Sequence, residues 1–225
     1  MNYAIIVAAG QSSRMKVKVD KAFVPLGSKP VLAYSMIAYE ECPEIDGIIV
    51  VVKKDRIDST KAMAKMFGCS KLETVVTGGS KRQLSVARGI EKLPRDVSIV
   101  AVHDGARPLI TPELISASIK AAKRYGSGVA GCRMTDTIKF VESGLKVTST
   151  LDRNKVWAVQ TPQTFKVKVL KEAYEYIDKN NLTVTDEASA LEVAGLDVHL
   201  VESETSNMKI TTLDDLTIAA ALLKL

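Results

Sequence analysis

The sequence is poor in the residues on which several classes of protein depend. Only three cysteines and two histidines occur among 225 residues. Cys42, Cys69 and Cys132 lie far apart and belong to no metal-binding pattern. An odd number of separated cysteines argues against a disulfide-stapled domain and predicts free, buried thiols in a reducing cytosol.

Aromatic residues and long apolar runs are scarce as well. Aromatics make up 5% of the chain, and no basic stripe accompanies them, so no nucleic-acid partner is expected. No segment reaches the roughly 18 apolar residues of a membrane-spanning helix, so no membrane partner is expected. The first residues are typical of a core strand rather than of a signal peptide, which predicts a cytoplasmic protein.

The remaining composition is that of an ordinary globular protein. Hydrophobic residues make up 46% and charged residues 25%, with a formal net charge of +5. The length favours one α/β domain over residues 1–225. A modest positive charge suits small phosphorylated substrates at least as well as nucleic acid, so charge alone does not identify the ligand.

Apolar runs alternate with amphipathic segments along the first half of the chain. Apolar runs predict buried parallel strands at residues 3–9, 46–52 and 97–102, and a short strand is predicted at residues 72–77, before Gly78-Gly79. Helices are predicted between and after these strands, beginning at Pro30, near Asp55, at a Ser80 cap and at Thr111. The alternation predicts a doubly wound, mainly parallel, Rossmann-like α/β sheet.

The patterns also predict which helical faces are buried and how the chain ends. The helix from Ser80 is expected to bury one stripe of side chains: Leu84, Ala87, Ile90 and Leu93. Two helices and a strand are expected later, at about 167–180, 186–194 and 198–201. A last helix is predicted from Thr212, because Asp215 completes a capping-box-like pattern. Its leucines are expected to pack against the body.

Residues 135–159 depart from this pattern. Segments 137–142 and 145–150 are typical of two strands joined by a turn at Ser143-Gly144. An isolated two-stranded ribbon is marginally stable in water, so its apolar side chains need cover: Ile138, Phe140, Leu145 and Val147. A second subunit is one such cover, which predicts a protruding β-hairpin arm and a homodimer. The alternative is an ordinary edge hairpin packed on its own domain.

Three unusual loops follow the predicted strands, at residues 10–21, 78–85 and 103–108. Ligands of doubly wound sheets bind beyond the carboxyl ends of the strands. We therefore expect these three loops to form one site.

The first loop is typical of phosphate binding. Gly10 lets the backbone approach a ligand closely, and Arg14 and Lys21 supply the positive charge that a triphosphate requires. The loop matches neither Gly-x-Gly-x-x-Gly nor Gly-x-x-x-x-Gly-Lys-[Ser/Thr], which excludes the usual dinucleotide site and P-loop. The alternative is a solvated basic loop.

The other two loops contain residues that could contact a nucleoside and a carboxylate that could bind a metal ion. Gly79, Ser80 and Ser85 are suited to a base or ribose, or else form only a tight turn and helix cap. Asp104 is placed to bind Mg²⁺, which prefers oxygen ligands beside phosphates, or else to cap local N–H groups. His103 is interpreted as a structural residue.

Seven motifs occur in order over nearly the whole chain. They are Ala8-Ala-Gly-Gln-Ser-Ser-Arg-Met, Asp20-Lys-Ala-Phe-Val-Pro-Leu, Gly78-Gly-Ser-Lys-Arg-Gln-Leu-Ser-Val, Val102-His-Asp-Gly-Ala-Arg-Pro, Thr135-Asp-Thr-Ile-Lys, Gln160-Thr-Pro-Gln-Thr-Phe and Thr185-Asp-Glu-Ala-Ser-Ala. Together they resemble the 2-C-methyl-D-erythritol 4-phosphate cytidylyltransferases of non-mevalonate isoprenoid synthesis. The fourth and sixth motifs are specific to this group, whereas the first recurs in many sugar nucleotidyltransferases.

The resemblance implies a role for each matching residue. It implies contacts to CTP from Ala8, Ala9, Gly10, Gly79, Ser80 and Ser85. It implies catalytic cations at Arg14, Lys21 and Lys209, and Mg²⁺ as cofactor beside Asp104. It implies acceptor contacts from Asp104, Arg107 and Thr185 of the same chain, and from Thr137, Arg153 and Thr161 of the neighbouring subunit's arm.

The implied reaction joins CTP to a small polyol phosphate and releases pyrophosphate. The sister family of ribitol 5-phosphate cytidylyltransferases resembles the chain in most of the same motifs, so the acceptor has two candidates. A nucleotide-binding regulator of the same fold is disfavoured because Arg14, Lys21 and Lys209 are all present. An NAD-dependent dehydrogenase is disfavoured because its glycine fingerprint is missing.

Overall fold

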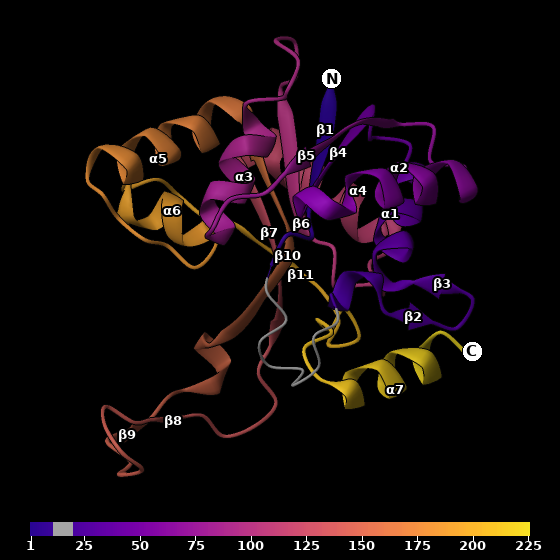
Figure 1. The fold of residues 1–225 in the computed structure, drawn as a ribbon. Helices are drawn as coiled ribbons and strands as arrows, with labels where there is room; N and C mark the ends of the chain where they lie inside the picture. Colours follow the sequence, from indigo (N-terminus) through magenta and orange to yellow (C-terminus); the bar gives the residue numbers. More distant parts are fainter. Residues whose placement is uncertain (11–19) are drawn as a thin grey trace.

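A seven-stranded sheet lies at the centre of the computed structural model, which describes residues 1–10 and 20–225 (Figure 1). Its strands are β1 (Asn2–Val7), β4 (Gly47–Val52), β5 (Leu72–Thr77), β6 (Ile99–Asp104), β7 (Ser127–Arg133), β10 (Trp157–Lys166) and β11 (Leu200–Glu202). They are ordered β11-β7-β10-β6-β1-β4-β5. Only β10 runs antiparallel to its neighbours, so the predicted, mainly parallel α/β sheet is confirmed.

Helices cover both faces of the sheet (Figure 1). One face carries α1 (Val31–Glu41), α2 (Ile57–Met66) and α4 (Pro112–Tyr125). The other carries α3 (Arg82–Ile90), α5 (Val167–Lys179) and α6 (Glu187–Val193). Both sides of each central strand are therefore apolar, which explains why these strands have continuous apolar sequences.

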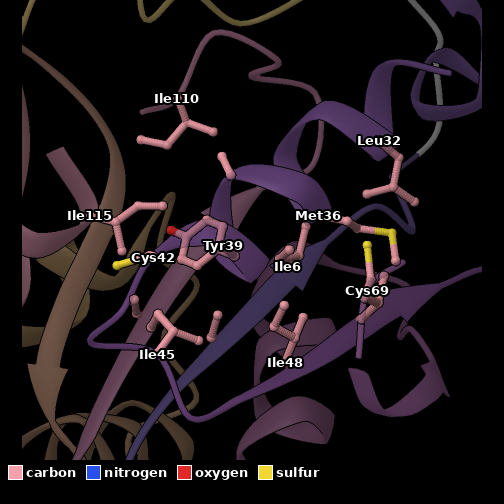
Figure 2. Close-up of a cluster of buried hydrophobic side chains, with 14 of the residues drawn as sticks. Ile6, Leu32, Met36, Tyr39, Cys42, Ile45, Ile48, Cys69, Ile110 and Ile115 are labelled. Atoms are coloured by element: carbon pink, nitrogen blue, oxygen red, sulfur yellow. The ribbon is translucent and has the colours of Figure 1, made fainter. Parts of the chain in front are cut away.

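Strand alternation divides the core into two clusters. In β1, Ala4 and Ile6 belong to the cluster under α1, while Tyr3 and Ile5 belong to the cluster under α3. Figure 2 shows the first cluster, where Ile6 lies near side chains of α1 such as Met36. Because helices pack on both faces, the sheet has a fixed position between them. The ends of its strands, where the loops begin, are fixed with it.

Several predicted elements are confirmed at their ends. Strand β5 has the predicted bounds. Helix α4 begins after an N-cap at Thr111, whose side chain accepts a hydrogen bond from Leu114 N–H. Helix α7 (Leu213–Leu222) begins with the predicted capping box of Thr212 and Asp215.

The predicted buried face of α3 is only partly correct, because Ile90 is buried and Leu93 packs against the same core cluster, but Leu84 is not buried. The helix begins after Lys81 rather than Ser80, its buried residues include Ser85, Val86 and Gly89, and Leu84 is 44% exposed. Gly89 faces β1 so closely that an added Cβ would lie 2.6 Å from Ile5. A small residue here lets the helix approach the sheet, and small or polar residues give a weak hydrophobic signal in the sequence.

Two strands of the seven-stranded sheet were not predicted. Strand β7 is rich in small residues, and β10 contains Pro162, which usually argues against a central strand. Strand β10 keeps its place through a register shift between Val159 and Gln163. Strand β6 has the expected length but begins and ends two residues later than predicted, because the polar residues His103 and Asp104 form its last two positions.

The arm leaves the sheet between β7 and β10 and projects away from the body (Figure 1). Its paired strands, β8 (Lys139–Phe140) and β9 (Ser149–Thr150), are much shorter than predicted. Large apolar side chains on the arm are exposed: Phe140 by 48%, Leu145 by 97% and Val147 by 51%. Within the described residues, the arm does not pack as an ordinary edge hairpin.

The chain end packs on a small satellite of the core. Helix α7 contacts the ribbon of β2 (Pro25–Leu26) and β3 (Lys29–Pro30), with Leu26 and Ala219 buried between them. Leu213 and Ile218 of α7 stay 56% and 50% exposed, so the expected packing of its apolar residues is only partly correct. The three cysteines are free and buried, as predicted. No helix of the described residues has the length and apolarity to cross a membrane.

Candidate functional site

A cavity of about 520 Å³ opens at the carboxyl edge of the parallel strands. Its walls come from the loops after β1 and β5, the ends of β4 and β6, and the segment before α7. The lining residues are Val7, Ala8, Ala9, Gly10, Asp20, Lys21, Ala22, Lys53, Gly79, Ser80, Lys81, Arg82, Ser85, Asp104, Ala106 and Lys209. The expected convergence of the loops is thus observed where a doubly wound sheet binds its ligands.

One wall consists largely of backbone. Gly79 N–H donates to Ser85 Oγ at 3.0 Å, which closes the loop before α3. A Cβ on Gly78 would lie 2.8 Å from Ser85 Oγ and also collide with Ala9. Glycine is therefore required for the loops after β1 and β5 to touch. Their close approach leaves a narrow wall of peptide groups that suits a flat base or a ribose.

Asp104 occupies the floor of the cavity, at the last position of β6. Its Oδ1 accepts from Arg82 Nε at 3.1 Å and its Oδ2 from Lys209 Nζ at 2.7 Å, with Arg107 Nε 3.9 Å away. Burial alone would raise the pKa of Asp104, but the positive charges of Arg82 and Lys209 outweigh it and hold the pKa well below its usual range. The carboxyl group is therefore ionised throughout the physiological range.

A buried polar relay supports the backbone behind Asp104. Asp104 N–H donates to Thr161 Oγ1 at 3.1 Å, and Thr161 Oγ1 lies 3.0 Å from His103 Nδ1. Burial lowers the pKa of His103 to about 3, so the ring is neutral. Nε2 faces the backbone carbonyl oxygen of Arg107 at 3.4 Å, which can only accept, so Nε2 carries the proton of the neutral ring and Nδ1 accepts from the Thr161 hydroxyl. His103 thus has the structural role expected of it.

Comparison with known proteins identifies the family. The family model for "IspD: 2-C-methyl-D-erythritol 4-phosphate cytidylyltransferase" matches residues 2–225. The chain belongs to this family. A relative from Clostridium acetobutylicum, named 2-C-methyl-D-erythritol 4-phosphate cytidylyltransferase, is 39% identical over 225 residues, covering 100% of this chain and 98% of the relative. One from Dehalococcoides mccartyi with the same name is 41% identical, covering 98% and 95%.

A solved structure agrees with this assignment. The crystal structure of 4-diphosphocytidyl-2C-methyl-D-erythritol synthase from Anaerococcus prevotii aligns with a TM-score of 0.89 at 30% identity. The alignment covers 100% of this chain and 96% of that one. Sheet, helices and arm of the chain therefore have counterparts throughout a family structure.

Most residues that the sequence selected line the cavity of the cytidylyltransferase. These are Ala8, Ala9, Gly10, Lys21, Gly79, Ser80, Ser85, Asp104 and Lys209. Arg14 lies outside the described residues. Arg107 is buried behind the cavity, where its Nη1 donates to Asn207 O at 2.7 Å. Thr185 is exposed beside α6 and pairs with Ser189 Oγ at 3.2 Å.

The three residues expected on the arm fall into two groups. Thr137 and Arg153 do lie on the exposed arm, and Arg153 Nη1 donates to Thr135 O at 2.9 Å. Neither lines the cavity of its own chain. The placement of Thr161 on the arm is wrong. Thr161 belongs to β10, is 3% exposed, and has its hydroxyl committed to Asp104 and His103.

Four charged residues of the cavity lining were not among the site residues selected from the sequence: Asp20, Lys53, Lys81 and Arg82. Arg82 stands inside the Gly78–Ser85 motif and bridges Asp104 and Glu187. Lys53 follows β4 and pairs with the buried Asp20 at 3.2 Å. Lys53 is the first residue beyond the carboxyl end of β4. It could have been selected from the sequence, because ligands of such sheets bind beyond the carboxyl ends of the strands.

A larger hollow of about 860 Å³ lies at the opposite edge of the sheet, around Ser98, Lys123 and Lys171. It adjoins the start of β6 and the start of α5. It contains neither a glycine loop nor a buried carboxylate. We therefore assign the site to the smaller cavity, where backbone, cations and carboxylate meet.

The site fits a single Mg²⁺ bound mainly by its substrate. Among the described residues, no group of three or more acidic, histidine or cysteine side chains is arranged for a metal. Asp104 offers one ionised carboxylate in the cavity. Mg²⁺ commonly takes one or two protein carboxylates and fills its other positions with phosphate oxygens and water. The donor set therefore suits an ion that arrives with a nucleotide.

The buried, neutral His103 makes stability depend on pH. Below about pH 6.5 the unfolded chain protonates this histidine and the folded chain does not. The free energy of unfolding is therefore expected to fall by about 1.4 kcal/mol per pH unit from this residue, down to its folded pKa. Replacing it by His103→Gln is expected to remove that part of the slope in urea unfolding between pH 7 and pH 4.

The second histidine provides the control. His199→Gln is expected to keep the part of the slope that His103 contributes, because His199 lies apart from the Asp104 relay, stacked on Tyr125. An unchanged slope in His103→Gln would contradict the assignment of a neutral, buried ring.

Proposed function

We propose that the protein transfers the cytidylyl group of CTP to 2-C-methyl-D-erythritol 4-phosphate, giving 4-diphosphocytidyl-2-C-methyl-D-erythritol and pyrophosphate. The observation that carries this proposal is the family match over residues 2–225. The relatives reported above bear the methylerythritol phosphate name, which favours this acceptor over ribitol 5-phosphate.

The charge of the cavity supports a triphosphate substrate. Five cationic side chains line it in the described residues: Lys21, Lys53, Lys81, Arg82 and Lys209. Only Asp20 and Asp104 are acidic. The surplus of positive charge attracts polyphosphate, and the backbone wall at Gly79 accommodates the nucleoside. CTP thus binds with its base at the glycine loops and its phosphates toward Lys21 and Lys209.

The reaction is a displacement at phosphorus. A phosphate oxygen of the acceptor forms a new P–O bond to the α-phosphorus of CTP, while the bond from that phosphorus to the β-phosphate oxygen breaks. Pyrophosphate leaves with the electron pair. The attacking phosphate is already ionised at neutral pH, so no general base is required. The protein acts mainly by positioning and charge stabilisation, which we assign to Lys21 and Lys209, and to Arg14 by family resemblance.

Magnesium belongs to this proposal. Asp104 would hold the ion, as the one carboxylate on the cavity floor. When bound, Mg²⁺ neutralises phosphate charge and polarises the oxygen atoms around the reacting phosphorus. Lys209 also pairs with Asp104, through a single contact from a side chain that is 31% exposed. This lysine can therefore turn from Asp104 toward a phosphate.

The acceptor half of the site is proposed to lie between two copies of the chain. Asp104, Arg107 and Thr185 border it within one copy. Thr137 and Arg153 of a second copy would complete it, carried by an arm whose apolar side chains need cover. Homodimer formation therefore accounts both for the exposed arm and for arm residues that do not line their own cavity.

A cytoplasmic location is also part of the proposal. All three cysteines are free thiols and buried. Free buried thiols suit a reducing compartment.

Pyrophosphate release with separate acceptors tests the activity. With CTP and Mg²⁺, turnover is expected with 2-C-methyl-D-erythritol 4-phosphate and not with ribitol 5-phosphate, and mass spectrometry identifies the product. Turnover with ribitol 5-phosphate alone would retain the chemistry and overturn the acceptor. No turnover with either would leave a nucleotide-binding protein of the same fold.

Two lysines are expected to carry transition-state charge. Lys21→Ala and Lys209→Ala should each lower kcat by about 10²–10³-fold, because each removes one preorganised cation. Circular dichroism and the urea midpoint check that the fold is intact. Lys65→Ala, on the exposed surface of α2, is the matched control and should turn over normally. Near-normal kcat in Lys21→Ala or Lys209→Ala would remove that residue from the catalytic set.

Subunit mixing tests the shared site. Arg153→Ala and Lys21→Ala are each expected to be inactive as pure dimers. After subunit exchange, each mixed dimer has one site in which both residues are intact, so activity should return. Native mass spectrometry confirms that mixed dimers form. Mixed dimers without activity would show that Arg153 serves the cavity of its own chain, and a pure Arg153→Ala dimer with normal activity would show that it serves no cavity.

A further inference from the structure

Glu187 is a buried carboxylate with no direct access to the cavity. It lies in the first turn of α6 and is 1% exposed. Its Oε1 accepts from Arg82 Nη1 at 2.7 Å and from the Tyr174 hydroxyl at 3.2 Å. A buried ionised carboxylate is costly unless it is paired. Glu187 therefore depends on Arg82, and Arg82 in turn lines the cavity.

Arg82 is held at two points by two carboxylates. Its Nε donates to Asp104 Oδ1 at 3.1 Å, while Nη1 donates to Glu187. A planar guanidinium fixed at two nitrogen atoms has little freedom to rotate. Lys209 makes a single contact with Asp104 from a flexible side chain that is 31% exposed. Of the two cations that hydrogen-bond Asp104, Arg82 is the fixed one and Lys209 the adaptable one.

Glu187 is itself anchored to the sheet. The backbone N–H groups of Glu187 and Ala188 both donate to Gln163 Oε1, at 3.0 and 2.9 Å. Gln163 Nε2 donates to Asp186 Oδ2 at 2.9 Å. Gln163 belongs to β10, the antiparallel neighbour of β6, which ends at Asp104. A chain of hydrogen bonds thus connects Gln163 of β10 to Glu187, Glu187 to Arg82, and Arg82 to the Asp104 carboxylate on the cavity floor.

We infer that Glu187 is a positioning residue for the reaction, acting through Arg82 to fix the direction in which the Asp104 carboxylate faces the cavity. The inference rests on the proposed function. When a phosphate draws Lys209 away from Asp104, the Arg82 contact remains and keeps Oδ1 in place. Stability alone does not account for the pair, because replacing a buried ion pair with apolar side chains of similar size is often neutral or stabilising.

The test separates positioning from stability. Glu187→Gln removes one of the two carboxylates that hold Arg82, and Arg82→Met leaves the buried Glu187 without its cation. The double variant Arg82→Met/Glu187→Met removes both charges and is expected to regain the wild-type urea midpoint. Its kcat is nevertheless expected to stay about 10²-fold below wild type, because Asp104 has lost its fixed partner. Its KM for CTP should change much less than its kcat, since the glycine wall and the four lysines of the cavity are intact.

A carboxylate at the other end of the sheet provides the control. Glu40 accepts hydrogen bonds from Ser70 Oγ and Lys71 N–H, away from the cavity. Glu40→Gln makes the same chemical change as Glu187→Gln and should leave kcat unchanged. If the double variant regains both its urea midpoint and its kcat, the pair is structural only and the inference is overturned.

A measurement without substrates keeps the inference separate from the proposed activity. In the wild type, hydrogen exchange of Arg82 Nε–H, followed by NMR, should be slow because both ends of the guanidinium are held. Glu187→Gln is expected to speed this exchange at least about tenfold, as loss of one charged hydrogen bond implies. An inactive wild type would overturn the proposed function, and unchanged exchange in Glu187→Gln would overturn the inference.

Discussion

The buried carboxylate of Asp104 is the constraint on which the site depends. An ionised group at the end of a central strand is tolerable only if cations reach it. Arg82 comes from α3, Arg107 from the loop after β6, and Lys209 from the segment before α7. These segments are far apart in the chain, so the pairing requires a finished sheet and both helical layers. The site therefore forms only when the fold does.

Polar contacts, rather than apolar packing, set the positions behind that carboxylate. Asn207 Nδ2 lies 2.9 Å from Thr161 O and 2.8 Å from Gln160 Oε1, while its carbonyl accepts from Arg107. The segment carrying Lys209 is thereby tied to β10. A hydrogen bond fixes direction as well as distance, so such a network holds side chains more exactly than apolar contacts do. A displacement of about 1 Å at a reacting group is costly in rate.

The sequence was informative where one physical signal dominated. Apolar runs predicted β1, β4 and β6, and cap chemistry predicted the starts of α4 and α7. Glycine loops at strand ends predicted the place of the cavity. The signal failed where small or polar residues are buried, as at Gly89 in α3 and throughout β7. Glu187 and Thr161 were harder still, because a polar residue shows its burial only through partners that are distant in sequence.

The distribution of charge explains how a strongly cationic cavity is compatible with a stable fold. The buried Arg107 and the partly buried Arg82 lie among two buried carboxylates, Asp104 and Glu187, so the charges behind the cavity are close to balanced. The surplus resides on lysines at the cavity surface, where water screens it. Phosphates can then replace water around the lysines without breaking the buried pairs. The charges that bind phosphate and the charges that are paired within the fold are thus carried by different side chains. Lys209 belongs to both groups, because it lines the cavity and pairs with Asp104.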